Sequence, residues 1–310
     1  MPVAVRPLPP ELVEKAKVEL FEDPKKLEDS IQHLKEWIAK QPHLKARTED
    51  QWLAAFLRGT KFSLERAKEK IDLYYSLKTL VPELQTINHR HPKFMEIVKT
   101  GVNLFLPKSN NLTDPRVVIF RVAAHTPGQF TMPEIMSVGN TLQKIMYMED
   151  DIFTVNGIVN VMDMKGATMS HFSQMTPLLM KKMVVAGQDA APMRMKAVHY
   201  FHMPPSIETI FNLVKTFLNE KNRSRILVHG KDFEPLYKYV SKDILPLEYG
   251  GNGGTIQEIT DYWVKKIEEY SEWLDEEEKY GTDESKRPGK PKTSEEMFGV
   301  EGSFRQLEVD

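Results

Sequence analysis

Three side chains of the types used in nucleophilic catalysis lie close together in the stretch "DMKGATMSH": Asp163, Ser170 and His171. In serine hydrolases a carboxylate orients a histidine, and the histidine activates the serine. The sequence lacks the G-x-S-x-G motif that exposes such a serine at a sharp turn. Ser170 stands where a helix is expected to begin, a position at which serine often caps the helix. We therefore keep a serine hydrolase as a lesser alternative and expect Asp163 to anchor the corner after its strand by accepting backbone N–H bonds.

Pairs of histidines raise the question of a metal site. His89 and His91 lie beside prolines in an expected loop, and His199 and His202 lie on an expected strand. Residues three apart on a strand point to opposite faces, and neither pair has a further ligand at a usual spacing. The sequence has no cysteine, so thiolate ligands are excluded as well. We predict no metal site and no cofactor.

Basic residues gather in two short segments, although the whole chain has a net charge of -2. The segment "PMRMKAV" contains Arg194 and Lys196, and "NEKNRSRILVHGK" contains Lys221 and Arg225. The overall charge argues against a general nucleic-acid binder. A local basic cluster is either a solvated surface or an anion site, and beside an apolar helix it suits phosphates on a membrane surface.

Length and composition set the broad class of protein. The 310 residues are enough for one large domain or two modest ones. The N-terminal stretch "MPVAVRPLPPELVEKAK" lacks the apolar run of a signal peptide, and no window is apolar enough to cross a bilayer. The absence of cysteine is typical of a reducing compartment. We expect a cytoplasmic protein.

The order of the expected elements divides the chain into three parts. Residues 1–99 have apolar residues at helical spacing and predict a helical module. Residues 100–280 alternate strands with helices, which predicts an α/β fold whose sheet is mixed but largely parallel and flanked by helices. We expect strands at 102–106, 116–122, 157–163, 197–203 and 225–229, and helices at 131–149, 171–186, 205–219, 233–240 and 255–280.

The last part, 281–310, is polar and contains prolines, and we expect a flexible C-terminal tail. Met297, Phe298 and Phe304 are more apolar than a solvated tail requires. The alternative is therefore a tail that folds back on the domain.

The helices of the α/β part are rich in apolar side chains, and methionine is frequent among them. Methionine is flexible and polarizable, so it suits a surface that adapts to varied apolar guests. The helix expected at 205–219 is apolar over more than a core-facing stripe. Such a helix is either buried on all sides or covers something apolar that comes and goes. For any single residue, plain core packing is the alternative.

Three stretches resemble the CRAL-TRIO lipid-binding family, in the insect form of the branch that contains α-tocopherol transfer protein and cellular retinaldehyde-binding protein. They are "DQWLAAFLRGTKFSLERAKEKI", "GIVNVMDMKGATMSHF" and "MKAVHYFHMPPSIETIFNLVKTFLNEKNRSRILVHG", with "DILPLEYGGNGGT" further on. The resemblance runs from about residue 25 to 280 and implies an N-terminal helical module, a lipid-binding domain and a mobile lid helix at 205–218.

The resemblance also implies two sets of binding residues. Basic residues that hold phosphoinositide headgroups correspond to Arg194, Lys196, Lys221 and Arg225, with Arg58 and Lys61 in "FLRGTKF". A further arginine of that segment is replaced here by Thr60, which weakens the cluster by one charge or shifts it to Lys61. The residues expected to line the lipid cavity are Phe120, Met136, Leu142, Ile145, Met146, Val161, Met175, Leu179, Met183, Tyr200, Ile207, Ile210, Phe211, Val214, Phe217 and Leu218.

One departure from the family bears on the cargo. The fungal phosphatidylinositol-transfer branch pairs a glutamate with a lysine on the lid; the lysine is present as Lys215, but the glutamate position is Met193. This favours an apolar guest such as a tocopherol, retinoid, carotenoid or other isoprenoid. We expect a non-enzymatic, monomeric carrier that binds such a lipid and associates transiently with phosphoinositide membranes. A lipid-regulated interaction module is the main alternative.

Overall fold

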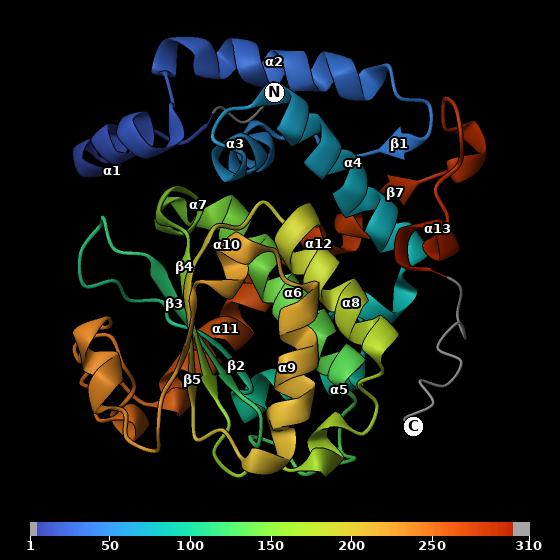
Figure 1. Ribbon diagram of the computed structural model, residues 1–310. Helices are drawn as coiled ribbons and strands as arrows, with labels where there is room; N and C mark the ends of the chain where they lie inside the picture. The colour runs from blue at the N-terminus through green and yellow to red at the C-terminus, as the bar shows by residue number, and fades with distance from the viewer. Residues whose placement is uncertain (1–4, 300–310) are drawn as a thin grey trace.

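The computed structural model describes residues 5–299 (Figure 1). Helices from residues 10–80 lie across the top of the view, and a five-stranded sheet flanked by helices lies below them. One hydrophobic core continues from Trp52 and Phe56 into Ile119 and Ile145, so the two parts share their interior. The predicted boundary at residue 100 stays a prediction.

The helical part begins with α1 (Pro10–Lys15), which continues into the π-helical turn η1 (Ala16–Leu20). Leu12, Ala16 and Leu20 are buried against Ile152 and Val155, so this segment is fixed on the α/β part. The remaining helices of the module are α2 (Pro24–Ala39), α3 (Asp50–Gly59), α4 (Leu64–Leu80) and α5 (Pro92–Thr100).

The sheet has the order β2-β3-β4-β5-β6, in which β2 runs antiparallel to β3 and the other pairs are parallel. This confirms the predicted α/β class with a mixed, largely parallel sheet. The strands are β2 (Asn103–Phe105), β3 (Arg116–Arg121), β4 (Ile158–Asp163), β5 (Met195–Phe201) and β6 (Ile226–Val228). The helices around it are α6 (Met132–Glu149), α7 (Asp151–Asn156), α8 (Pro177–Val185), α9 (Glu208–Phe217), α10 (Glu220–Arg223), α11 (Ile256–Glu269) and α12 (Ser271–Glu277).

Three predicted helices differ in extent. The helix predicted at 171–186 begins only at Pro177, where Thr176 caps it, and a short 3-10 turn covers Met169–Phe172. The segment predicted at 233–240 is a 3-10 helix, Glu234–Lys238. The helix predicted at 255–280 divides at Tyr270 into α11 and α12.

The prediction that Asp163 anchors a strand corner is confirmed. Its Oδ1 accepts from the backbone N–H of Lys165 at 3.0 Å, and its Oδ2 accepts from the hydroxyl of Tyr249 at 2.6 Å. The ring of His202 also contacts Oδ1 at 3.0 Å. These bonds fix the turn that ends β4 at the middle of the sheet.

The C-terminal segment 281–299 folds back on the helical module, so the prediction of a flexible tail is wrong for these residues. Strand β7 (Gly281–Thr282) pairs with β1 (Leu44–Lys45), and helix α13 (Ser294–Phe298) packs on α8. Phe298 is buried in the cluster that contains Leu179. The apolar residues noted in the sequence explain this packing, except Phe304, which lies outside the described residues.

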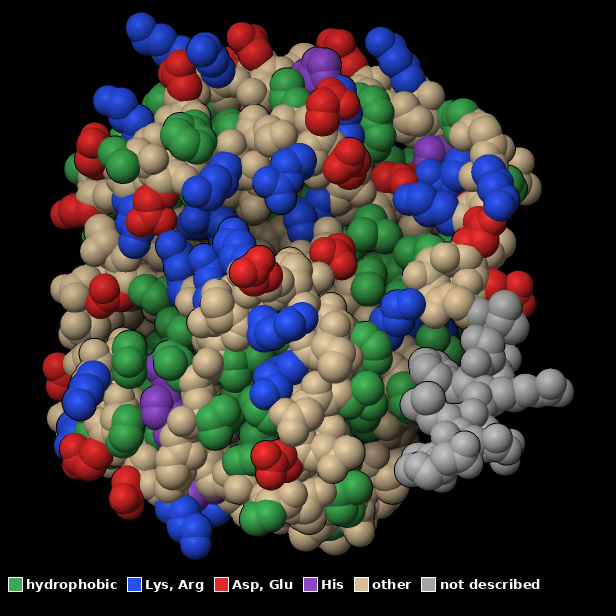
Figure 2. Space-filling model, viewed as in Figure 1, with side chains coloured by type: hydrophobic (Ala, Val, Ile, Leu, Met, Phe, Trp, Pro, Cys, Tyr) green, Lys and Arg blue, Asp and Glu red, His purple; other side chains and the backbone are tan. Residues whose placement is uncertain are grey.

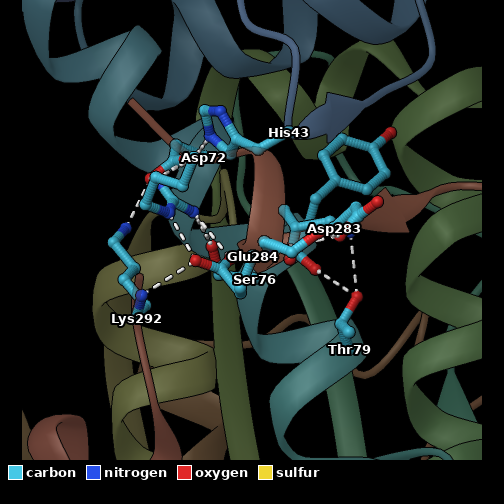
Figure 3. A network of polar contacts seen from close by, with 11 residues as sticks. His43, Asp72, Ser76, Thr79, Asp283, Glu284 and Lys292 are labelled. Carbon is cyan, nitrogen blue, oxygen red and sulfur yellow. Dashed lines mark hydrogen bonds and ion pairs between the residues drawn. The ribbon is translucent and has the colours of Figure 1, made fainter. Parts of the chain in front are cut away.

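A polar network holds this segment in place (Figure 3). Nη1 of Arg287 donates to both carboxylate oxygens of Asp72 on α4, at 2.9 and 3.0 Å. Asp72 also pairs with Lys292 and with His43. The Nε and Nη2 of Arg287 bond to Glu284. We call these five residues the C-terminal clamp.

None of the helices within residues 5–299 combines the length and the apolar composition that a bilayer crossing requires.

Replacing Arg287 with alanine should destabilise the fold. The substitution leaves two partly buried carboxylates with fewer partners, so we expect the free energy of unfolding to fall by about 2 kcal/mol. Urea unfolding followed by circular dichroism measures the change. Lys290→Ala is the matched control, because the Lys290 side chain is 81% exposed. Equal losses in the two variants would contradict the clamp.

The clamp also predicts a dependence on pH. Burial alone would raise the pKa of Asp72, but its bonds to Lys292 and His43 outweigh burial and lower it. Burial alone would also raise the pKa of Glu284, but the bond from Arg287 lowers this pKa to about 2. Since both folded-state values lie below the unfolded ones, the stabilisation is present above about pH 4 and is lost as the pH falls toward 2. Wild type and Arg287→Ala should therefore differ in stability at neutral pH and converge in acid; a difference that stays constant in acid counts against this.

Candidate functional site

An apolar cavity of about 340 Å³ lies between one face of the sheet, α6 and α9. The sheet contributes side chains that alternate along each strand, such as Val118 and Phe120 on β3. Methionine is the most frequent lining residue. The apolar lining consists of Phe105, Val118, Phe120, Val122, Met132, Met136, Met162, Met164, Phe172, Met175, Met183, Tyr200, Met203, Ile207, Ile210, Phe211 and Val214.

Helix α9 forms one wall of this cavity and is loosely held. Its Ile210, Phe211 and Val214 line the cavity, yet no residue of α9 is fully buried. The ring of Phe211 contacts Tyr200 at 4.8 Å between centroids, and the ammonium of Lys215 lies over Phe211. An apolar face that the protein itself only partly covers is what a helix over a removable guest would present.

Nine of the predicted lining residues lie at the cavity. They are Phe120, Met136, Met175, Met183, Tyr200, Ile207, Ile210, Phe211 and Val214. The other seven do not belong to its lining: Leu142, Ile145, Met146, Val161, Leu179, Phe217 and Leu218.

The incorrect assignments have two physical causes. On β4, Val161 points to the opposite face of the sheet, where it is fully buried in the core, and its neighbours Asn160 and Met162 face the cavity. On α6, Leu142 and Ile145 face the main core, which also contains α3 side chains. The cavity side of that helix is the row that contains Met132, Met136, Gly139 and Gln143. Leu179 on α8 is buried in the hydrophobic cluster that contains Phe298.

Four amide side chains interrupt the apolar lining: Asn103, Asn140, Gln143 and Asn160. The NH₂ of Asn103 donates to the carbonyl of Ile135 at 3.1 Å, and that of Asn140 donates to Leu84 at 3.1 Å. Their carbonyl oxygens are thereby left as the groups that can accept from a ligand. The sequence analysis missed these four residues. Side chains alternate between the two faces of a strand, so once Met162 on β4 is placed at the cavity, Asn160 is expected there too.

A second hollow, of about 390 Å³, lies between the N-terminal helices and the segment around α10, and Lys and Arg side chains surround it (Figure 2). We call it the basic groove. Its cations are Lys61, Arg66, Lys70, Arg194, Lys196, Lys221 and Arg225, and Glu19 is the acidic residue of its lining. Of the six predicted headgroup residues, five are therefore brought together.

Arg58 is the exception and has a different role. Its guanidinium is fully buried, bonds to both oxygens of Glu22 at 3.0 Å, and reaches Asp151 at 3.0 Å. A cation neutralised in the interior cannot serve a headgroup, so assigning Arg58 to the anion site was wrong. Thr60 bonds back to the carbonyl of Phe56, and Lys61 is the residue of this segment that reaches the groove as a cation.

The sequence analysis missed Arg66 and Lys70, which lie four residues apart on α4 and so on one helical face. Lys70 donates to the backbone carbonyls of Asp189 and Ala191 at 2.7 and 2.9 Å. Burial lowers its pKa to about 8. Lys70 thus holds η4 (Ala186–Ala190), which follows α8, against the helical module.

The cations of the basic groove repel one another, which disfavours their charged forms. Burial lowers the pKa of Lys221, and Arg225 and Lys61 lower it further. Burial likewise lowers the pKa of Arg194. The Nε and Nη2 atoms of Arg194 are buried and have no hydrogen-bond partner among the described residues. Buried donors of this kind usually have a partner, so they point to an anion or water that completes the site.

The cavity and the groove are neighbours. Met183 on α8 lines both, and Leu218, directly after α9, lines the groove. Asn219 caps α10, and its backbone N–H donates to Gln188 in the groove wall. A displacement of α9 would therefore act on the groove through residues 218–222.

The alternative of a serine hydrolase needs Asp163 to orient His171, and the structure does not bring them together. Both oxygens of Asp163 are engaged by Lys165, His202 and Tyr249. His171 bonds instead to Thr168 and to the carbonyl of His125. The proposed arrangement of these three residues is thus wrong.

Comparisons with known proteins agree with this architecture. A sequence profile of the CRAL/TRIO domain matches residues 101–251, and a profile described as "Pinta-like, UBA domain" matches residues 23–92. The chain is similar to the human protein named α-tocopherol transfer protein-like, with 34% identity over 256 residues, 81% of this chain and 72% of that protein. It is also similar to human clavesin-2, with 28% identity over 246 residues, 79% of this chain and 75% of that protein.

Among solved structures, the one titled "Crystal structure of Sfh5" superposes with a TM-score of 0.52 at 16% identity, over 81% of this chain and 96% of that one. At that identity the likeness concerns the fold alone. The identity to the transfer-protein relative, together with the domain profile over the sheet and α9, shows that this chain belongs to the CRAL/TRIO family of lipid-binding proteins.

Proposed function

We propose that this protein carries a small hydrophobic lipid in the apolar cavity and exchanges it at phosphoinositide-containing membranes by opening α9. The observation that supports this most directly is the cavity of about 340 Å³, which is lined mostly by apolar side chains and has as one wall α9, a helix without a buried residue. Ligand pockets for small molecules have volumes in this range.

The energetic reason for a closed cavity is direct. A lipid with roughly 400 Å² of apolar surface costs on the order of 10 kcal/mol to hold in water. A carrier must bury nearly all of that surface during transport and must release it at the membrane. Helix α9 is proposed to move because its apolar face meets the cavity and contributes no buried residue to the main core.

The basic groove supports the membrane step. Each cation near an anionic leaflet contributes about 1 kcal/mol of attraction. Phosphate groups would also relieve the mutual repulsion among Lys221, Arg225 and Arg194. Because residues 218–222 connect the groove to α9, headgroup binding and lid opening would favour each other.

The cargo is proposed to be apolar, of the tocopherol, retinoid, carotenoid or isoprenoid type. Met193, at the position of the glutamate in the phosphatidylinositol-transfer branch, lines the basic groove, and its sulfur accepts from the cavity residue Gln143 at 3.1 Å. Lys215 is engaged over Phe211 rather than with an acid. The name of the similar α-tocopherol transfer protein-like relative points to the same class.

A lipid-regulated interaction module is the second candidate. It is favoured by the contact of α13 with α8, because Met183 on α8 lines the cavity and the buried Phe298 of α13 packs in the cluster that contains Leu179 of α8. Deleting residues 281–310 separates the two: lipid exchange that is unchanged supports simple transport, and altered exchange supports regulation through this segment.

Filling the cavity should abolish cargo binding without unfolding the protein. Val214→Trp places a large side chain from α9 into the cavity, and we expect affinity for a fluorescent tocopherol or retinoid to fall at least about tenfold, since the guest loses contact area. Asn212→Trp, on the exposed side of the same helix, is the control. Fluorescence titration measures affinity, and thermal unfolding checks the fold. Retained affinity in Val214→Trp excludes this cavity as the cargo site.

Removing two groove cations should weaken membrane binding. Lys221→Ala/Arg225→Ala should reduce binding to phosphoinositide vesicles by roughly tenfold or more, because two attractive charges are lost. Lys231→Ala/Lys238→Ala removes the same charge from exposed positions outside the groove. Co-sedimentation with vesicles measures both. Equal binding by the two double variants would remove the groove from the mechanism.

A further inference from the structure

Glu19 is an acidic side chain among the cations of the basic groove. Its Oε2 lies 3.0 Å from Nζ of Lys196 and 3.7 Å from Nη1 of Arg194, and its Oε1 lies 3.6 Å from Nζ of Lys15. A carboxylate thus occupies part of the space in which a phosphate would meet Lys196 and Arg194.

The local backbone directs Glu19 into the groove. It lies on η1, a π-helical turn, and such wider turns often occur at functional sites. Leu12, Ala16 and Leu20 anchor α1 and η1 to α7, and Phe21 ends the turn in a left-handed conformation with φ of 64°. The main chain is therefore fixed, while the Glu19 side chain is 36% exposed and can turn toward solvent.

The Glu19 carboxylate does not satisfy all the hydrogen-bond donors of the cations beside it. The contact to Arg194 is longer than a hydrogen bond, and Nε and Nη2 of Arg194 have no partner among the described residues. Burial alone would raise the pKa of Glu19, but its bond to Lys196 and the charges of Lys196, Lys15 and Arg194 lower it, so Glu19 is ionised at neutral pH. A larger anion with more acceptor oxygens would satisfy both cations better.

We propose that Glu19 is a built-in competing anion that a phosphate ligand must displace from Lys196 and Arg194. The inference rests on the proposed anion site. An anion with one negative charge that displaces Glu19 carries the same charge as the carboxylate, so its attraction to Lys196 and Arg194 brings no net gain. A multiply charged phosphate leaves a gain, and Glu19 thereby sets a threshold of charge for binding in the groove.

The test compares Glu19→Gln with Glu14→Gln. Glu14 lies on the same segment, is exposed and does not line the groove, so its substitution changes net charge equally. Two probes separate the sources of phosphate: soluble inositol trisphosphate in calorimetry, and phosphatidylcholine vesicles with phosphatidylinositol bisphosphate in co-sedimentation. Vesicles with phosphatidylserine probe a headgroup of low charge.

We expect Glu19→Gln to tighten binding of the trisphosphate and of the bisphosphate vesicles by about fivefold to tenfold, as expected when one repulsive charge near the ligand is removed. Binding to phosphatidylserine vesicles should become measurable. Glu14→Gln should change each affinity by less than about twofold. In a Lys196→Met background the gain from Glu19→Gln should largely disappear, a coupling that a merely structural role of Glu19 would not produce.

The outcomes are distinct. Equal affinities in Glu19→Gln and Glu14→Gln, or weaker binding in Glu19→Gln with unchanged thermal stability, overturn the inference. If wild type binds no vesicles but binds the trisphosphate, and Glu19→Gln tightens that binding, the inference stands for a free phosphate ligand and the membrane role fails. If neither probe binds wild type, the anion site itself is wrong, and the inference falls with it.

Discussion

The structure depends on one constraint: the apolar face of the sheet beneath α9 must not meet water. Val118, Phe120 and Met162 on the strands line the cavity. Apolar surface of this kind is costly to hydrate. Helix α9 covers this face, and its own apolar side also turns toward the cavity. In the proposed function, a guest lipid or a membrane would keep both apolar surfaces away from water.

The same constraint explains why the cations lie where they do. A lid that opens in water exposes both apolar surfaces, whereas a lid that opens against a bilayer transfers its apolar face to acyl chains. In the proposed mechanism, charges that hold the protein at an anionic leaflet would be most useful next to α9. The groove lies at the end of α9, and Met183 belongs to both sites. As proposed, Glu19 would limit this attraction, because it pairs with Lys196 until a stronger anion displaces it.

How much of this the sequence could predict depends on the kind of signal. Alternating strands and helices predicted the α/β class and the positions of the five strands, because periodicity is a local property. The apolar excess at 205–219 marked the helix that forms one wall of the cavity. The incorrect predictions concern the direction in which a side chain points. Val161 and Leu142 are apolar because they pack in the main core, and they do not line the cavity. Arg58 looks like its neighbour Lys61 in sequence, and only the distant Glu22 and Asp151 give it a buried role. Similarly, Asp72 and Arg287 are far apart in the chain, so their pairing had no local signal.

These long-range ion pairs also determine which parts of the molecule can move. Arg58 ties α3 to Asp151 on α7, and the buried Arg47 bonds to Glu277 on α12 at 2.6 Å. The C-terminal clamp adds a tie between α4 and residues 284–292. Breaking a buried pair of this kind costs several kcal/mol, so these elements form a rigid frame. Within residues 5–299 no ion pair involves α9. If α9 moves as proposed, its connections at Pro205 and at residues 218–222 would absorb the change, and a factor that acts on either connection would control access to the cavity.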